Sequence, residues 1–138
     1  MHKLVLDTNI YISGFLWEGN EAKLIRKIEN GKASAFISKE ILEEIDDVLR
    51  RDKFTEVLNK AGTTADEVVS KIVSLSTIVI GPKLKENVVK EDKKDDKFIE
   101  CALNAKANTI ISGDEHLLKL KKYKNIEIIT TSDALKLL

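Results

Sequence analysis

Acidic residues follow two apolar runs that lie far apart in this sequence. Asp7 ends the run Leu4-Val5-Leu6, and Asp114 follows Ile110-Ile111-Ser112-Gly113. Ligands of an open parallel sheet bind beyond the carboxyl ends of its strands, so acids at two strand ends can converge in space. Carboxylates without a cluster of Cys or His are the ligands of Mg²⁺ or Mn²⁺ rather than zinc. These two signals together predict a metal site.

Further acids lie between these two in the sequence. Asp95 and Asp96 stand where a helix is expected to begin, and a single acid would be enough to cap it. Glu100 follows Asp96 by four residues, a spacing at which like charges repel unless a cation is nearby. Glu44 is the weakest candidate, because acids surround it and only its position at the edge of an apolar helix stripe distinguishes it.

The same residues also have ordinary structural explanations. Asp7 and Asp114 can each cap the helix that follows, where a carboxylate is favourable in any case. Thr8, Asn9 and Ser112 are expected to support the carboxylates by hydrogen bonds, although each could equally satisfy a turn. The metal-binding interpretation of Asp7 is preferred only because Asp114 repeats the pattern.

The remaining chemically active residue types are expected to be ordinary. His2 and His116 lack the spacing of metal ligands, and Cys101 lies among apolar residues and is expected to be packed in a core. With one cysteine, no disulfide can form within the chain. No run approaches the roughly 20 apolar residues needed to span a bilayer, and the N-terminus does not resemble a signal peptide. A cytoplasmic protein with no membrane segment is expected.

The charge balance allows a polyanionic substrate but does not require one. The chain has 23 basic and 23 acidic residues, so its net charge is zero. Metal binding would neutralise several carboxylates and leave the remaining surface positive, which suits nucleic acid. Four lysines near Asp114 are weak candidates for holding it: Lys119, Lys121, Lys122 and Lys124. For the lysine run alone, a solvated surface is the preferred explanation.

Strands and helices are expected to alternate along the chain. Continuous apolar residues predict a buried strand over 3–7, and an amphipathic stripe predicts a helix that Ser38 caps. A charged segment, 83–94, is expected to be a mobile loop. The other strands are expected at 33–37, 77–80, 109–112 and 126–129, and the other helices at 20–31, 53–61, 64–76, 95–106, 115–120 and after Thr131 or Ser132. This order predicts an α/β sandwich with a mainly parallel sheet, as a single domain over residues 1–138.

The ordered motifs resemble those of the PIN domain family of metal-dependent ribonucleases, in particular its VapC-like toxin branch. The resemblance covers nearly the whole chain. The matching pieces are Leu4 to Asn9, the helix with Glu44 and Val48-Leu49, Asp95 to Ala102, Ile110 to Asp114, and Leu117-Leu118 with the strand 126–129.

The resemblance implies a PIN-like three-layer sandwich and an acidic quartet of Asp7, Glu44, Asp96 and Asp114. Asp7, Asp96 and Asp114 would be metal ligands, with Asp95 and Glu100 in supporting positions. It further implies Mg²⁺ or Mn²⁺, an RNA substrate, an antitoxin partner and a homodimer. Asp92 and Asp95 remain alternatives for the third ligand.

Two other functions fit parts of the pattern. A non-catalytic scaffold could bind RNA or protein through the same fold. An aspartyl-phosphate phosphatase also begins with an Asp after its first strand, but such sites usually need a second Asp two positions on, where this chain has Asn9.

Overall fold

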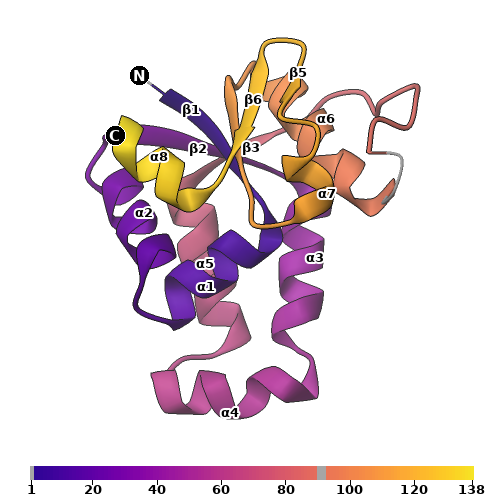
Figure 1. Ribbon diagram of the computed structural model, residues 1–138. Helices are drawn as coiled ribbons and strands as arrows, with labels where there is room; N and C mark the ends of the chain where they lie inside the picture. The colour runs from indigo at the N-terminus through magenta and orange to yellow at the C-terminus, as the bar shows by residue number, and fades with distance from the viewer. Residues whose placement is uncertain (1, 90–92) are drawn as a thin grey trace.

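Six strands of the described residues form one twisted sheet in the order β3-β2-β1-β4-β6-β5 (Figure 1). The computed structural model describes residues 2–89 and 93–138. All neighbouring strands are parallel except β5, which runs antiparallel to β6. The strands are β1 His2–Leu6, β2 Ala33–Ser38, β3 Ser76–Val79, β4 Thr109–Ile111, β5 Lys122–Tyr123 and β6 Ile126–Ile129.

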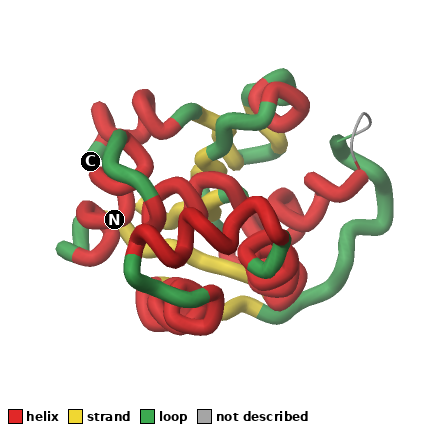
Figure 2. The backbone as a smooth tube through the Cα atoms, turned by 90° about the horizontal axis from the view of Figure 1, so that it is seen from below, coloured by secondary structure: helices red, strands yellow, loops and turns green. Residues whose placement is uncertain are grey.

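Helices connect the parallel strands and flank the sheet. Helix α6 contacts β1, β2, β3 and β4, whereas α1 packs against α2 and α3, and α2 packs against α8. The view from below shows the helices gathered over the strands (Figure 2). Their bounds are α1 Thr8–Leu16, α2 Asn20–Glu29, α3 Lys39–Leu49, α4 Asp52–Ala61, α5 Ala65–Leu75, α6 Asp96–Ala105, α7 Glu115–Leu118 and α8 Thr131–Leu137, with a short 3₁₀ turn at Lys93–Asp95 before α6. The predicted α/β sandwich with a mainly parallel sheet is confirmed.

The two central strands bring the predicted acids to one edge of the sheet. In the parallel register Leu6 lies opposite Ile111, so β1 and β4 end together. The N–H of Asp7 continues the ladder by donating to the carbonyl of Ile111 at 3.0 Å. Leu6 and Ile111 are fully buried, as expected for strands covered on both faces. Residues just beyond these strand ends must therefore be neighbours.

Helix α1 was not predicted as a separate element, and its composition explains why. Ile10, Tyr11 and Ile12 are consecutive buried residues, which give no amphipathic stripe. Gly14 lowers helix propensity but allows α2 to approach closely, because a Cβ there would lie 2.5 Å from Ile25 Cγ1 and 3.0 Å from the carbonyl of Glu21. Tertiary packing thus decides the conformation of this segment.

The ends of two other helices differ slightly from expectation. Ser38 caps α3 as predicted, accepting from the N–H of Ile41 at 3.3 Å. The cap of α8 is Thr130, whose hydroxyl accepts from the N–H of Asp133 at 3.2 Å, rather than Thr131 or Ser132. This is a one-residue difference, since Thr and Ser at consecutive positions offer equivalent caps.

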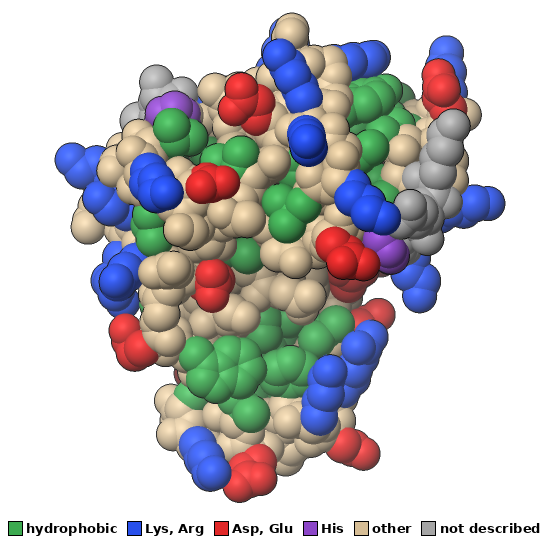
Figure 3. All heavy atoms as spheres, viewed as in Figure 1, with side chains coloured by type: hydrophobic (Ala, Val, Ile, Leu, Met, Phe, Trp, Pro, Cys, Tyr) green, Lys and Arg blue, Asp and Glu red, His purple; other side chains and the backbone are tan. Residues whose placement is uncertain are grey.

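Helix α4 lies across the end of the α3–α5 arm, away from the sheet (Figure 1). At this arm the ring of Trp17, which follows α1, lies 6.4 Å from that of Phe54 in α4. Apolar side chains are visible above α4 in the space-filling view (Figure 3). None of the helices in the described part of the chain has the length and apolar character required to cross a membrane.

Candidate metal centre

Asp7 is a buried carboxylate at the junction of β1 and α1. Its side chain is only 4% exposed. Oδ1 caps α1 by accepting from the N–H of Ile10 at 3.0 Å, and Oδ2 accepts from the hydroxyl of Ser112. Burial raises the pKa of Asp7 above its usual value, and the negative charge of Asp114 adds to the rise. The capping and metal-site interpretations are therefore compatible, because a nearby cation would offset this electrostatic cost.

Ser112 connects the two acids that follow β1 and β4. It is fully buried, its hydroxyl donates to Asp7, and its oxygen accepts from the N–H of Asp114 at 2.9 Å. Asp114 in turn caps α7, accepting from the N–H of His116 at 2.7 Å. The two acids thus lie in one hydrogen-bonded unit, although 107 positions separate them in the sequence.

Asp95, Asp114 and His116 form a group that could hold a metal ion. Each offers one ligand atom, and these atoms all lie within 4.8 Å of one another. Opposite ligands of an octahedral Mg²⁺ lie about 4.2 Å apart, twice the metal–oxygen distance. Asp95 is buried and comes from the 3₁₀ turn before α6, whereas the other two residues are half-buried. The donor set therefore fits a divalent cation held mainly by carboxylates.

His116 was expected to be ordinary, but the structure brings it into this group. Its Nδ1 lies 3.9 Å from Asp114 Oδ1. Helix α7 begins directly after Asp114, so its first turn folds the residue two positions later back toward the carboxylate. Spacing rules that look for clusters of His and Cys miss such a residue, since the other members of the group are aspartates.

Asp96 lies next to the group but faces the preceding segment. Oδ1 accepts from the N–H of Val89 at 2.6 Å and Oδ2 from that of Val88 at 3.3 Å. Val89 is buried, so this carboxylate anchors the described end of the segment that was expected to be a mobile loop. The structure thus separates Asp96 from its neighbour Asp95. The other alternative, Asp92, lies outside the described residues.

Glu44 reaches the same region from α3 and is held from two sides. Oε1 accepts from the hydroxyl of Thr8, the first residue of α1. Oε2 lies 2.6 Å from Nζ of Lys97, in the first turn of α6. The hydroxyl of Thr8 therefore contacts Glu44 rather than Asp7. The sequence did not predict a contact between Lys97 and Glu44, because nothing in the sequence distinguishes Lys97 from the many other lysines.

Two further residues were expected to support the carboxylates, Asn9 and Glu100. Asn9 is exposed at the second position of α1. Glu100 lines a pocket of about 350 Å³ beside β3, together with Glu40 and Cys101. Burial raises the pKa of Glu100, and the charge of Glu40 adds to this rise. Cys101 is fully buried, which confirms the prediction of a packed residue.

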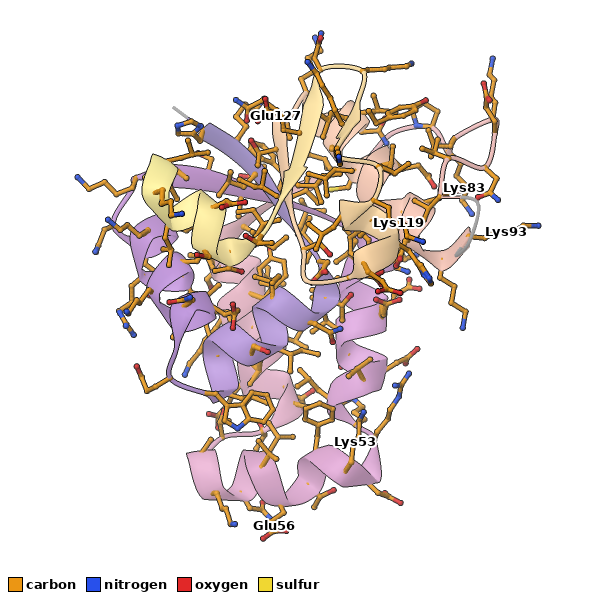
Figure 4. All side chains as sticks on the ribbon, in the orientation of Figure 1. Lys53, Glu56, Lys83, Lys93, Lys119 and Glu127 are labelled. Carbon is orange, nitrogen blue, oxygen red and sulfur yellow. The ribbon has the colours of Figure 1, made fainter. Side chains whose placement is uncertain are left out.

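The four candidate lysines are exposed, but they do not form a single patch around the acids. Lys119 directly follows α7, five positions after Asp114, and lies on the same side of the molecule as Lys93 and Lys83 (Figure 4). Lys122 is opposite Glu127 in the β5–β6 pair. On this face an acidic patch and a histidine lie side by side, with lysines around them (Figure 3). Lys121 and Lys124 adopt left-handed backbone conformations in the turns on either side of β5.

The fold and the site define an α/β protein with an acidic centre beyond the carboxyl ends of two central parallel strands. The sequence matches the PIN domain family over residues 3–116, most of the chain, and the protein therefore belongs to that family. No curated protein sequence matches it significantly.

A solved structure supports the same fold. A chain of VapBC2 from Rickettsia felis, crystallised bound to a DNA fragment from the promoter, superimposes with a TM-score of 0.63. The match covers 93% of this chain and 98% of that one, at 15% sequence identity. Similarity at this level of identity concerns the fold.

Proposed function

We propose that this protein is a metal-dependent ribonuclease that hydrolyses phosphodiester bonds of RNA. The observation that carries the proposal is the approach of the Asp95, Asp114 and His116 ligand atoms to within 4.8 Å, next to the buried Asp7. Membership of the PIN domain family supports it, since by resemblance such proteins use a quartet of acids at this edge of the sheet. Mg²⁺ and Mn²⁺ are the proposed cofactors, because most of the donors are hard oxygen atoms.

We assign Asp7, Asp95 and Asp114 as the carboxylates that would hold the ion, with His116 at its border. Asp95 replaces Asp96 in this assignment and is one of the two alternatives that the sequence left open. Asp96 would support the site by anchoring the backbone before α6.

Several side chains of the protein would each have a separate role in hydrolysis. A bound divalent cation would lower the pKa of a water molecule and stabilise negative charge on the leaving oxygen. Glu44, oriented by Thr8 and Lys97, would position the attacking water and accept its proton. Ser112 would fix the relative position of Asp7 and Asp114. Lys119 and Lys93 would attract the phosphate backbone.

We propose further that the protein acts in the cytoplasm as the toxin component of a toxin–antitoxin pair, as a homodimer with a small antitoxin partner. The sequence resemblance to VapC-like toxins supports this role. The VapBC2 structure is consistent with it, because its chain shares the fold over nearly the whole length.

An RNA cleavage assay tests the proposed activity. Purified protein would be incubated with end-labelled single-stranded and structured RNAs in Mg²⁺ or Mn²⁺, with and without EDTA. Cleavage is expected from the wild type and from Asp47→Asn, an exposed control on α3, but not from Asp114→Asn. Loss of cleavage in EDTA is also expected. Equal cleavage by folded Asp114→Asn would contradict the proposed site, and RNA binding without cleavage would favour a non-catalytic scaffold.

A further inference from the structure

Lys97 places a positive charge inside the acidic region. It is the second residue of α6, directly after Asp95 and Asp96. Its side chain is only 14% exposed, and its ammonium group lies 2.6 Å from Glu44 Oε2 while also donating to the carbonyl of Lys94. Lysine is rarely this buried unless it is paired, because removing its charge from water is costly. The ion pair between Lys97 and Glu44 is therefore part of the contact between α6 and α3.

This ammonium group lies beside Glu44 Oε2, where a cation bound by that oxygen would have to lie. Glu44 uses one oxygen to accept from Thr8 and the other to pair with Lys97. A divalent ion bound at Oε2 would lie next to the ammonium group, and the repulsion between the two positive charges opposes binding there. The ligand atoms that approach within 4.8 Å of one another are those of Asp95, Asp114 and His116.

We propose that Lys97 is a positioning residue that takes the place of a second divalent ion, so that one metal ion serves each chain. It would hold Glu44 in the orientation needed to act on water, from the side opposite Thr8. Because this role presupposes the ribonuclease reaction proposed above, its test needs a measurement that does not depend on catalysis. The number of Mn²⁺ ions bound per chain provides one.

The test compares wild type, Lys97→Met and Lys97→Arg, with Lys39→Met as a matched control. Lys39 pairs with Glu43 on the same helix as Glu44, at 3.8 Å, but both side chains are exposed. Isothermal titration calorimetry would count bound Mn²⁺, and steady-state RNA cleavage would give kcat and KM. Thermal melts would verify that each variant folds.

We expect the wild type, Lys97→Arg and Lys39→Met each to bind a single Mn²⁺, and Lys97→Met to bind a second, because its Glu44 is released. We also expect kcat of Lys97→Met to fall about 10- to 100-fold, the usual cost of losing a group that orients a metal-site residue. Its KM should change little, and Lys97→Arg should recover most of kcat.

Several results would contradict the proposal that Lys97 takes the place of a second metal ion. Two Mn²⁺ ions bound to the wild type would show that Lys97 does not replace one. An unchanged stoichiometry in folded Lys97→Met would do the same. A rise in KM with constant kcat would indicate that Lys97 contacts RNA instead. If no protein cleaves any RNA, the ribonuclease proposal fails, whereas the stoichiometry still decides whether Lys97 stands in for a cation.

Discussion

Replacing Asp7 with Asn should make the metal-free protein more stable at neutral pH. Burial and the charge of Asp114 raise the pKa of Asp7 above its unfolded value of 3.8, despite hydrogen bonds from Ser112 and two backbone N–H groups. The folded state therefore binds a proton at the Asp7 carboxyl more tightly than the unfolded state does. At neutral pH the ionised carboxylate consequently opposes folding. This unfavourable contribution is fully present above the raised folded pKa and disappears as the pH falls below 3.8.

Asn has nearly the same shape as Asp but does not ionise. Because burial and the charge of Asp114 disfavour only the ionised form of Asp7, we expect Asp7→Asn to have a higher free energy of unfolding than the wild type. For a chain of this size, each kcal/mol gained in the free energy of unfolding raises Tm by about 3 °C. The gain should shrink as the pH approaches 4, because the wild-type carboxylate then becomes protonated.

Saturating Mn²⁺ should reverse this ranking. A ligand at 100 times its Kd stabilises the folded state by about 2.7 kcal/mol, or roughly 8 °C here. The wild type should gain this amount and Asp7→Asn much less, because it lacks one proposed ligand. Differential scanning calorimetry at pH 7 with EDTA or Mn²⁺ measures both effects, with the exposed Asp47→Asn as control. The reasoning is refuted if Asp7→Asn is less stable in EDTA, or if Mn²⁺ stabilises both proteins equally.

Three further predictions concern the site and the packing of the core. Asp95→Asn should lower RNA cleavage at least 100-fold. Asp96→Asn should lower it less than tenfold and mainly increase proteolysis before α6. Equal losses of cleavage in the two variants would contradict the assignment of Asp95 as the metal ligand. Gly14→Ala should destabilise the protein by about 1–3 kcal/mol in urea unfolding, because its Cβ would clash with Ile25 Cγ1 at 2.5 Å; an unchanged midpoint would contradict this. Burial raises the pKa of Cys101 to about 12, so its thiol should react with a maleimide only after unfolding, and rapid labelling of the native protein would show that the residue is accessible.

The convergence of Asp7 and Asp114 could be predicted because it depends on strong local signals. Each acid follows a continuous apolar strand, and the order of strands and helices predicts a parallel sheet. No comparable sequence signal decides which of Asp95 and Asp96 faces these two acids. Successive helical residues are rotated by about 100°, so a one-residue difference decides whether a side chain faces the centre. The 3₁₀ turn at Lys93–Asp95 sets that rotation, and it directs Asp95 toward Asp114 while Asp96 faces Val89.

Two residues of the centre gave no usable signal in the sequence. His116 lies beside Asp114 only because α7 begins there, and Lys97 pairs with Glu44 only because α6 packs against α3. Both contacts depend on tertiary structure, as does helix α1, whose apolar surface lacks a helical stripe. Sequence patterns locate residues at the ends of elements better than residues that reach across from another element.

We propose that a divalent cation binds among the acids beyond β1 and β4. Anomalous X-ray scattering from crystals grown with Mn²⁺ would locate the ion directly. We expect one peak per chain, within coordination distance of carboxylate oxygens from Asp7, Asp95 and Asp114. No peak at saturating Mn²⁺, or a peak only at Asp96 or between Glu44 and Lys97, would contradict the account.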